Sequence, residues 1–524
     1  MTLLRSSLAH ASLLGATLAI TGCANMTSST PVTIAPTPSA AVIAQLAPTG
    51  TLRASINFGN PILANWDPAG GPPRGVSVDL AREIGRRLGV PVQLVTFESA
   101  GQVTEAISSR RVDVGFLAVD PQRSGRGMAF TAPYVVIEGA YLVRNDSPLR
   151  DNAEVDRPGT RIAVGNGSAY DLYLARELKH AKLERAASSP VVTDYFLANK
   201  LDVAAGVKQQ LEADARRLPG LRLLPGRFMV IGQAMAIPAS TDKDREGAQW
   251  LSAFAEEMKT GGFVAAALAR HNIQGAAVGE ANPFWPLTYA AHRSPRNVAR
   301  DAWRHPAEAL AFFGIRPDST VVEILPGSGG YYMEILAPYL RDRGRYIAAN
   351  RDAVAPPQYQ ADHQRLLNRL KAEPALYGKV EVTAFNASLH AIAPPGSADV
   401  VMTFRDLHNC MARGEFEGAM RAFHAALKPG GVLAVVDHRA RTDLPRDAQL
   451  KAGYVRQDEA IAIIEKAGFR FEAASEMNAN PKDTKDHPEG VWTLPPTLRM
   501  KDVDRAKYLA IGESDRFTLR FVKR

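Results

Sequence analysis

A glycine-rich turn between an apolar strand and a helix most strongly limits how this chain can fold. The stretch "VVEILPGSGGYYMEIL" runs from Val321 to Leu336. Gly327 and Gly329 allow a tight turn and let a ligand approach the backbone without meeting a Cβ. The Gly-Lys-Ser/Thr ending of nucleotide-hydrolysing loops is absent. The stretch therefore predicts an α/β domain whose nucleotide-like cofactor lies at the carboxyl end of a strand.

The 524 residues are too many for one ordinary domain, and strand and helix patterns alternate in two series. The first series starts near Gly50; in it, Leu80, Ile84 and Leu88 share one helical face that ends at Gly89. A linker is predicted at 276–290. The strands expected after it are Val321–Leu325, Arg345–Ala349, Val380–Phe385, Asp399–Phe404, Val432–Asp437, Arg470–Ser475 and the terminal "RFTLRFVKR".

The amino terminus has the pattern of an export signal. Arg5 precedes an apolar segment that is too short for a comfortable membrane span. The segment ends in Ile-Thr-Gly-Cys, which resembles the bacterial lipobox, so residues 1–23 are expected to be a signal peptide and Cys23 to receive lipid. The alternatives are an ordinary signal or a chance cysteine. Ala24 follows in place of Asp, so we expect a periplasmic lipoprotein, with the outer membrane favoured.

Residues 24–48 are rich in Ser, Thr, Pro and Ala and are predicted to be a flexible tether. Acylation of Cys23 would leave Cys410 alone, without an intrachain disulfide. The net charge of +8 comes from scattered Lys and Arg, so nucleic acid is not an expected partner. No Cys, His and Asp residues have metal-ligand spacing in the sequence, and no metal site is expected.

Residues 50–275 resemble the family 3 extracellular solute-binding proteins. The resemblance rests on the ordered motifs "GTLRASINFG", "GVSVDLAREIGRRLGVPVQLV", "AISSRRVDVGFLAVDPQR" and "FTAPYVV". It implies a solute-binding domain at 49–275 with the two-lobed periplasmic-binding-protein fold and a possible ABC permease partner. Lobe one would hold 50–143 and 238–275, and lobe two 147–232, with crossovers near Val143–Ser147 and Met229–Ile237.

The resemblance also implies a set of ligand-binding residues. Arg123, in "VDPQR" with Asp120, matches the family arginine that grips a ligand carboxylate. Ser168 begins a helix whose N–H groups would face an anion, and Phe58 and Lys208 complete the site. The alternatives are a surface ion pair for Arg123, a plain helix cap for Ser168 and a core position for Phe58; Trp66 has the same ambiguity.

Two departures from the family pattern bear on the solute. Where amino-acid receptors carry an acidic group for the ligand ammonium, this chain has Val207 or Lys208. A lysine would repel an ammonium group. Before Arg123 this chain has the apolar residues Phe116, Leu117 and Ala118, whereas the family has small hydroxyl residues there. The expected solute is therefore an organic anion or another small carboxylate.

Residues 291–524 resemble class I methyltransferases that use S-adenosylmethionine, and more narrowly a group of exported predicted methyltransferases. The motifs are "AAHRSPRNVARDAWRHPAEALAFFGI", "VVEILPGSGGYYMEILAPYL", "ADVVMTFRDLHN", "ALKPGGVLAVVDHRA", "GYVRQDEAIAIIEKAGF" and "GESDRFTLRF". The resemblance implies a Rossmann-like fold and an S-adenosyl-L-methionine site. The residues it places there are Glu323, Pro326, Gly327, Ser328, Gly329, Asn350 and Asn386, the two asparagines standing where acidic residues are usual.

Polar residues crowd the end of the strand in "TFRDLHN", which in this family faces the methyl group. His408 is a candidate general base, and Arg405 a candidate to hold an anionic acceptor. The alternative is a structural hydrogen-bond network that includes Asp406 and Asn409, and His438 has the same ambiguity.

Two functional hypotheses follow. In the first, an exported lipoprotein joins a solute-binding module to a methyltransferase that acts on a small molecule. In the second, the protein binds or senses a solute and its C-terminal domain retains only the methyltransferase fold.

Overall fold

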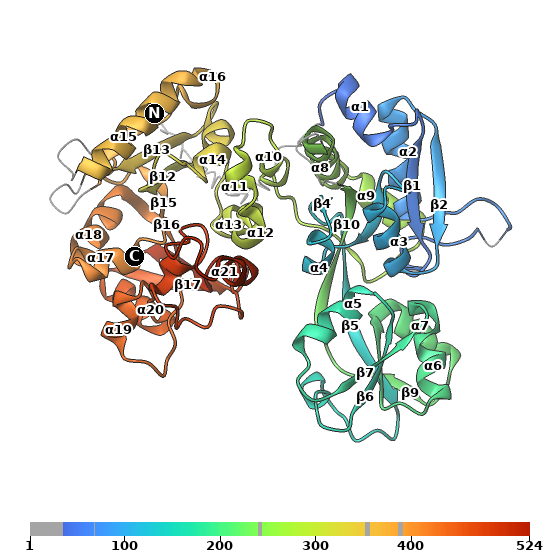
Figure 1. The fold of residues 1–524 in the computed structure, drawn as a ribbon. Coiled ribbons are helices and arrows are strands. Elements are labelled where there is room, and N and C mark those ends of the chain that lie inside the picture. The colour runs from blue at the N-terminus through green and yellow to red at the C-terminus, as the bar shows by residue number, and fades with distance from the viewer. Residues whose placement is uncertain (1–34, 68, 239–243, 352–356, 386–390) are drawn as a thin grey trace, which may run out of the picture.

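The structure of the chain is a computed structural model that describes residues 35–67, 69–238, 244–351, 357–385 and 391–524. The predicted signal peptide, its Cys23, the first part of the predicted tether and Asn386 lie outside these residues. Two α/β bodies are joined through α10 (Trp285–Thr288), the first drawn from blue to green and the second from yellow to red (Figure 1). Among the described residues, no helix combines the length and apolarity that a membrane span needs.

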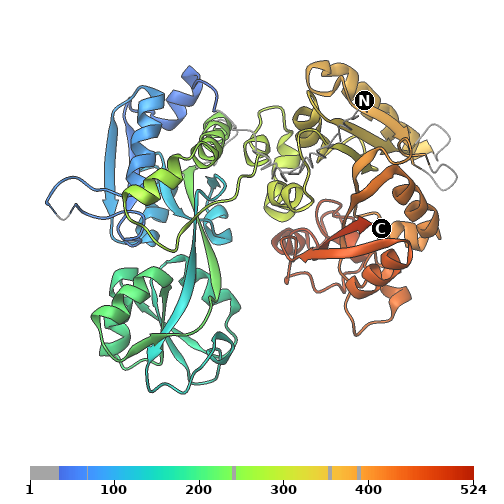
Figure 2. The same cartoon turned by 180° about the vertical axis from the view of Figure 1, so that it is seen from behind.

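The first body has two lobes that share a sheet. Strands β5 (Val135–Arg144) and β10 (Met229–Pro238) pair antiparallel and pass from one lobe into the other. In lobe one β10 pairs with β3 (Gly115–Ala118), and in lobe two β5 pairs with β8 (Val203–Val207). Gly139 of β5 pairs with Val207 of β8, so the chain has already entered lobe two at this residue. The first crossover therefore lies near Val135, earlier in the sequence than the expected Val143–Ser147. Figure 2 shows these long strands linking the lobes from behind.

Lobe one packs helices around a short parallel pair of strands. Helix α2 buries Leu80, Ile84 and Leu88, and Gly89 ends it in the left-handed conformation at φ 70°, which confirms the predicted face and cap. The elements of this lobe are β1 (Leu52–Asn57), α2 (Val76–Leu88), β2 (Val92–Phe97), α3 (Ala100–Ser108), α4 (Pro121–Ser124), β4 (Met128–Phe130), α8 (Arg245–Thr260), α9 (Phe263–Arg270) and β11 (Ala277–Val278).

Lobe two adds parallel strands beyond β8, in the order β8-β6-β7. A core that includes Phe196 and Leu211 lies between this sheet and helices α6 and α7. The elements are η1 (Asn152–Glu154), β6 (Arg161–Gly165), α5 (Ala169–Glu177), β7 (Lys182–Ala186), η2 (Ser189–Val191), α6 (Val192–Ala198), α7 (Lys208–Arg217) and β9 (Leu221–Leu223).

The last part of the predicted tether is a helix. Residues 40–46 form α1 (Ala40–Leu46), which buries Val42 and Leu46 and is capped by Ser39. Trp250 of α8 donates its indole N–H to the Pro36 carbonyl at 2.8 Å. The spacing of Val42 and Leu46 gives one turn an apolar side, so this end of the segment packs on lobe one although its composition favoured a tether.

The second body is a seven-stranded sheet covered on both sides. Its strand order is β14-β13-β12-β15-β16-β18-β17, and β18 alone runs antiparallel to its neighbours. All seven strands expected after the linker are present. They are β12 (Thr320–Ile324), β13 (Arg345–Asn350), β14 (Glu381–Ala384), β15 (Ala398–Phe404), β16 (Leu427–His438), β17 (Phe469–Ser475) and β18 (Arg516–Lys523).

Alternate residues of the central strands enter two separate cores. Val322 belongs to the core under α18 and α20, whereas Val321 belongs to the core under α13 and α14. The elements around the sheet are α11 (Pro295–Val298), α12 (Asp301–Arg304), α13 (Pro306–Phe312), α14 (Met333–Leu340), α15 (Pro357–Ala372), α16 (Pro374–Tyr377), α17 (Leu407–Ala412), α18 (Phe416–Ala426), α19 (Arg446–Lys451), α20 (Gln457–Lys466), η4 (Gly490–Thr493) and α21 (Arg505–Ile511). Helices on both faces leave the carboxyl edge of the parallel strands as the place for a site.

Candidate functional sites

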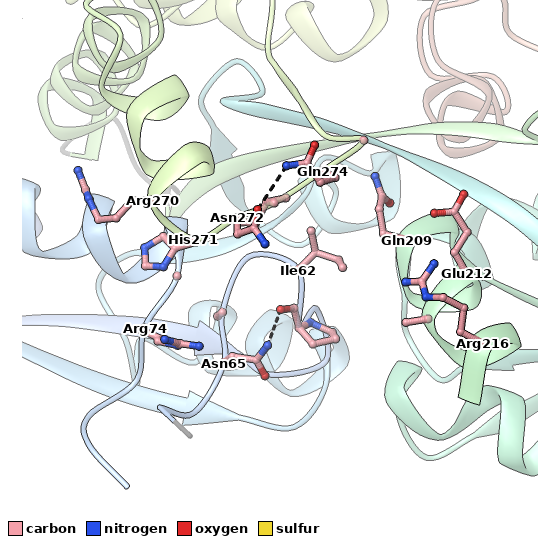
Figure 3. Close-up of a pocket in the computed structure, with 16 residues that line it drawn as sticks. Ile62, Asn65, Arg74, Gln209, Glu212, Arg216, Arg270, His271, Asn272 and Gln274 are labelled. Atoms are coloured by element: carbon pink, nitrogen blue, oxygen red, sulfur yellow. Dashed lines mark hydrogen bonds between the residues drawn. The ribbon is translucent and has the colours of Figure 1, made fainter. Parts of the chain in front are cut away.

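A cavity of about 670 Å³ lies between the lobes of the first body. One wall comes from lobe one, from residues 61–75 and 270–275, and the other from α7 of lobe two. Figure 3 shows side chains from both walls facing the same space. The volume falls in the range of small-molecule sites in proteins.

Arginines dominate the charged lining of this cavity. Arg270 and His271 both contact the Asp79 carboxylate, at 2.5 and 2.9 Å. The guanidiniums of Arg74 in lobe one and Arg216 in lobe two have no ion pair or hydrogen-bonded partner among the described residues. Glu212, which lies beside Arg216 on α7, is the acidic side chain of the lining (Figure 3). Two guanidiniums that no protein carboxylate holds favour an anionic occupant.

The predicted ligand residues Asp120 and Arg123 connect the two lobes. Arg123 is 1% exposed and donates to the Ala118 carbonyl at 2.7 Å and, across the cleft, to the Gly167 carbonyl at 2.8 Å. Burial lowers the pKa of Arg123 to about 10. Asp120 forms an ion pair with Arg176 of lobe two at 2.9 Å. In this state both side chains bind protein groups of the opposite lobe.

The other three predicted ligand residues also have protein partners. Ser168 caps α5 by accepting from the Asp171 N–H at 3.1 Å. Lys208 forms an ion pair with Glu138 at 2.9 Å, and Phe58 is buried with its ring centroid 4.7 Å from that of Trp66. None of the five predicted residues is among those lining the cavity.

Sequence reasoning missed the cavity residues of α7, although a signal was present. Residues 209, 212, 213 and 216 have the i, i+3, i+4, i+7 spacing of one helical face, and all four line the cavity. A face of this kind that carries Gln, Glu and Arg next to a cleft is a candidate ligand surface. Gln209 supports this assignment, because its Oε1 is buried without a hydrogen-bond partner.

In the second body the glycine turn joins β12 to α14 as expected. Leu325 and Gly327 have φ values of 51° and 63°, so the chain reverses sharply after β12. Pro326, Ser328 and Gly329 complete the turn. Ser328 donates its N–H and its hydroxyl to the Asp362 carboxylate of α15, the hydroxyl at 2.5 Å. The turn thus holds a carboxylate that the protein itself supplies.

Two polar side chains are buried at the neighbouring strand ends. Glu323, 6% exposed, accepts a hydrogen bond from the Tyr346 hydroxyl, and burial raises the pKa of Glu323 to about 7. Asn350 ends β13 and is 3% exposed, and its Nδ2 is buried without a partner. An unsatisfied buried amide is rare and indicates a missing partner.

His408 is held by a buried aspartate. Its Nδ1 lies 2.8 Å from the Asp437 carboxylate, and its Nε2 is buried without a partner. The neighbouring His438 places its Nδ1 2.5 Å from the Ser514 hydroxyl. A carboxylate on one ring nitrogen fixes the orientation of the imidazole and leaves the other nitrogen to meet a partner.

The fold also brings the potential ligand atoms of His408, Asp437 and His438 within 4.8 Å of one another, so this group could hold a metal ion. Spacing along the sequence does not reveal this group, because residues 408 and 437 are far apart in sequence and meet only at the edge of the sheet. Both Asp437 oxygens already accept hydrogen bonds, from the His408 and His438 backbones and from the His408 ring. A metal-binding Asp437 would have to give up some of these bonds.

Arg405 directly follows β15 and takes the left-handed conformation at φ 61°. No hydrogen bond or ion pair holds its guanidinium among the described residues. Asp406 accepts from Asn409 at 3.1 Å and lies 3.3 Å from the Cys410 thiol, so these predicted network residues do form a local network. The candidate catalytic residues Arg405 and His408 therefore share one edge, and Arg405 stands outside that network.

The geometry defines a two-lobed binding domain followed by a doubly covered α/β domain with a site at its sheet edge. Residues 61–275 match the family model of bacterial extracellular solute-binding proteins, family 3. The first body thus carries a solute-binding domain of this type, as the sequence resemblance implied.

Solved structures similar to the chain include a mutant of ArgBP from T. maritima, with 20% identity, 44% of this chain and 99% of that chain covered, and a TM-score of 0.39. The cysteine-binding protein of Campylobacter jejuni has 18% identity, coverage of 44% and 92%, and a TM-score of 0.39. The solute receptor for L-cysteine of Neisseria gonorrhoeae has 20% identity, coverage of 44% and 95%, and a TM-score of 0.39. A comparison with curated proteins found no match.

Proposed function

We propose that this protein captures a small anionic solute with its first domain and transfers a methyl group to a small molecule with its second. The observation that carries the enzymatic half is the set of groups that converge at one sheet edge: the glycine turn after β12, the unsatisfied amide of Asn350 and the aspartate-held His408. The strand order, with one antiparallel strand inserted between β16 and β17, supports a class I methyltransferase fold.

The turn after β12 and the end of the neighbouring strand β13 fit an adenosyl cofactor in two respects. The buried Asn350 Nδ2 would donate to a ribose hydroxyl, and a Cβ at Gly329 would meet no atom within 4 Å, which leaves room beside the turn. S-adenosylmethionine would supply an electrophilic methyl group there. Glu323 would accept hydrogen bonds from the amino-acid part of the cofactor.

His408 would act as the base. Its Nε2 is the free nitrogen, and Asp437 would stabilise the imidazolium that forms when Nε2 takes the proton of an acceptor group. The burial of both side chains excludes water from the proton transfer, since His408 is 2% and Asp437 0% exposed.

Calorimetric titration of residues 24–524 with S-adenosylmethionine and its demethylated product tests the cofactor site. We expect binding that is lost in Gly327→Val. Gly396→Val is a matched control, because Gly327 and Gly396 share a φ of 63° and therefore the same backbone strain, whereas Gly396 lies outside the turn. Absence of binding at millimolar cofactor, or equal loss in both variants, would refute the proposed site.

One contact favours a second candidate function, in which the domain keeps the fold without turnover. The Ser328 N–H and hydroxyl already hold Asp362, so part of the turn is occupied by the protein itself. A non-catalytic solute sensor needs no cofactor, and the same titration separates the two functions.

Mass spectrometry of material that co-purifies with the protein tests the solute class. We expect a small carboxylate or another anion, lost in Arg216→Gln and in Arg74→Gln. Arg217→Gln is the control on the same helix, because Arg217 pairs with Asp194 at 3.1 Å and does not line the cavity. A bound zwitterionic amino acid would contradict the anion assignment.

We also propose that a lipid on Cys23 anchors the protein at the outer membrane and that the first domain delivers its solute to an ABC permease. Residues 1–34, which include Cys23, are outside the described part of the chain. Cys23→Ser is expected to abolish incorporation of labelled palmitate. Incorporation that persists in this variant would rule out lipidation at Cys23.

A further inference from the structure

Three arginines share one buried carboxylate at the sheet edge of the second domain. Arg300, Arg304 and Arg516 each donate to Glu513, at 2.7, 3.0 and 2.6 Å. Arg304, Arg516 and Glu513 are 5%, 2% and 2% exposed. Burying a guanidinium is costly unless its charge is matched, and here a single carboxylate matches three.

Arg405 is the fourth guanidinium of this group, which we call the arginine cluster: Arg300, Arg304, Arg405 and Arg516. The strand register brings its members together. Phe404, just before Arg405, pairs with Val436 of β16, and His438 of the same strand pairs with Arg516 at the start of β18. The left-handed backbone of Arg405 is strained for a non-glycine residue, and such strain collects at functional sites.

The charges of the arginine cluster do not balance. Four guanidiniums face Glu513 and, near Arg304, the buried carboxyl of Glu323, whose pKa burial raises to about 7; the nearby Asp301 pairs with Arg293 at 2.5 Å. Several N–H groups are also left over: Nη2 of Arg300 and of Arg304 and Nε of Arg516 are buried without a hydrogen-bond partner. An anionic ligand would neutralise the excess positive charge and accept hydrogen bonds from the unpaired N–H groups.

We infer that the arginine cluster binds the oxyanion of a ligand, a carboxylate or phosphate group, beside His408. This inference deepens the proposed function by naming a charged group on the bound molecule. It rests on the proposed function only in the choice of the molecule that carries this group. The oxyanion belongs either to the methyl acceptor or to the carboxylate of the cofactor itself.

The electrostatics of neighbouring groups agree with this geometry. Burial and the positive charge of Arg304 lower the pKa of Arg405 well below its ordinary value. Although burial alone would raise the pKa of Glu513, the charges of Arg304, Arg516, Arg300 and Arg405 lower it. An added anion would relieve the repulsion among the guanidiniums.

Titration with inorganic phosphate tests the site in residues 24–524 carrying Arg74→Gln and Arg216→Gln, which removes the charges of the cavity in the first domain. We expect phosphate to bind at millimolar concentrations or below and Arg405→Gln to weaken it by about tenfold or more. Arg405→Lys keeps the charge and loses the planar fork, so it should retain part of the affinity if Arg405→Gln folds poorly.

Arg421→Gln is the control, because this arginine of the same domain is 68% exposed and lies 3.7 Å from its Glu417 partner. Repeating the phosphate titration with saturating S-adenosylmethionine separates the two sources: competition assigns the site to the cofactor carboxylate, and independent binding assigns it to the acceptor. No phosphate binding, or equal affinity in the parent and Arg405→Gln, would overturn the inference. Cofactor binding by the parent without phosphate binding would reject the oxyanion site alone.

Discussion

The buried carboxyl of Glu323 should make the second domain less stable at alkaline pH, and Glu323→Gln should remove this effect. Glu323 is 6% exposed at the end of β12 and accepts from the Tyr346 hydroxyl. Burial raises the pKa of this carboxyl from 4.5 to about 7. A glutamine has the same shape, can accept the same hydrogen bond and carries no charge.

The sign follows from proton linkage. Because the folded state holds the proton more tightly than the unfolded state, native stability is highest below about pH 4.5 and falls as the pH rises towards 7. A rise of about 2.5 units, at about 1.4 kcal/mol per unit, gives a penalty of about 3 kcal/mol once the carboxyl is fully ionised. Glu323→Gln should therefore stabilise the domain by about 3 kcal/mol at pH 8 and by less than about 1 kcal/mol at pH 5.

Urea unfolding followed by pulsed hydrogen exchange, read by mass spectrometry on peptides from β12 and β13, reports on this domain separately from the first. Glu417→Gln is the control, since Glu417 is 87% exposed and should show no such pH dependence. A gain that is equal at pH 5 and pH 8, or no gain at pH 8, would refute the reasoning. A clear gain at pH 8 would identify Glu323 as a group kept at a stability cost, which is typical of functional sites.

Three further perturbations test other parts of the structure. Arg176→Ala removes the ion pair to Asp120 across the cleft; we expect a larger mean separation of the lobes by small-angle scattering in the absence of solute, and an unchanged profile would contradict a latch at this contact. Leu46→Ala, at a position 1% exposed, should lower the local stability of α1 by about 2–4 kcal/mol and speed proteolysis before Leu52; unchanged cleavage would argue against docking of α1. Gly512→Ala would place a Cβ 2.3 Å from the Trp303 ring at a φ of 90°, so the thermal transition of the second domain should fall by several degrees, and an unchanged transition would show that Trp303 can move aside.

The second domain could be read largely from its sequence because each of its strands is a short apolar run next to a turn. The order of the strands and the chemistry of their ends depend on pairings between distant residues. Arg516 begins the last strand, yet it pairs with His438 and reaches the same carboxylate as Arg304. Because Arg304 and Arg516 are far apart in sequence, no local pattern predicts that they share a carboxylate. The sequence therefore predicted Arg405 and His408 but not the arginine cluster.

In the first domain the motifs predicted the lobes better than the cavity. Its position in a motif makes Arg123 a predicted ligand residue, whereas the structure gives it a partner in the opposite lobe. The cavity itself lies where a loop of lobe one faces α7, and the only residue of α7 among the predicted ligand residues is Lys208, which does not line the cavity. Helical spacing alone would have placed Gln209 and Arg216 on one face, but it could not say what that face met.

The junction decides how the two domains can communicate. Residues of the predicted linker are held by lobe one: Lys259 donates to the Glu280 carbonyl at 2.8 Å, Glu256 accepts from the Asn282 N–H at 2.8 Å, and Tyr289 donates to the Phe130 carbonyl at 2.8 Å. The Lys259–Glu256 pair itself is almost fully buried, at 1% and 2% exposed. The second domain is thus fastened to lobe one, while lobe two is joined to lobe one through β5 and β10 (Figure 1). Closure of lobe two on a solute would act on a strand that also contacts the junction, since β11, at the start of the predicted linker, pairs with Val135 and Val136 of β5.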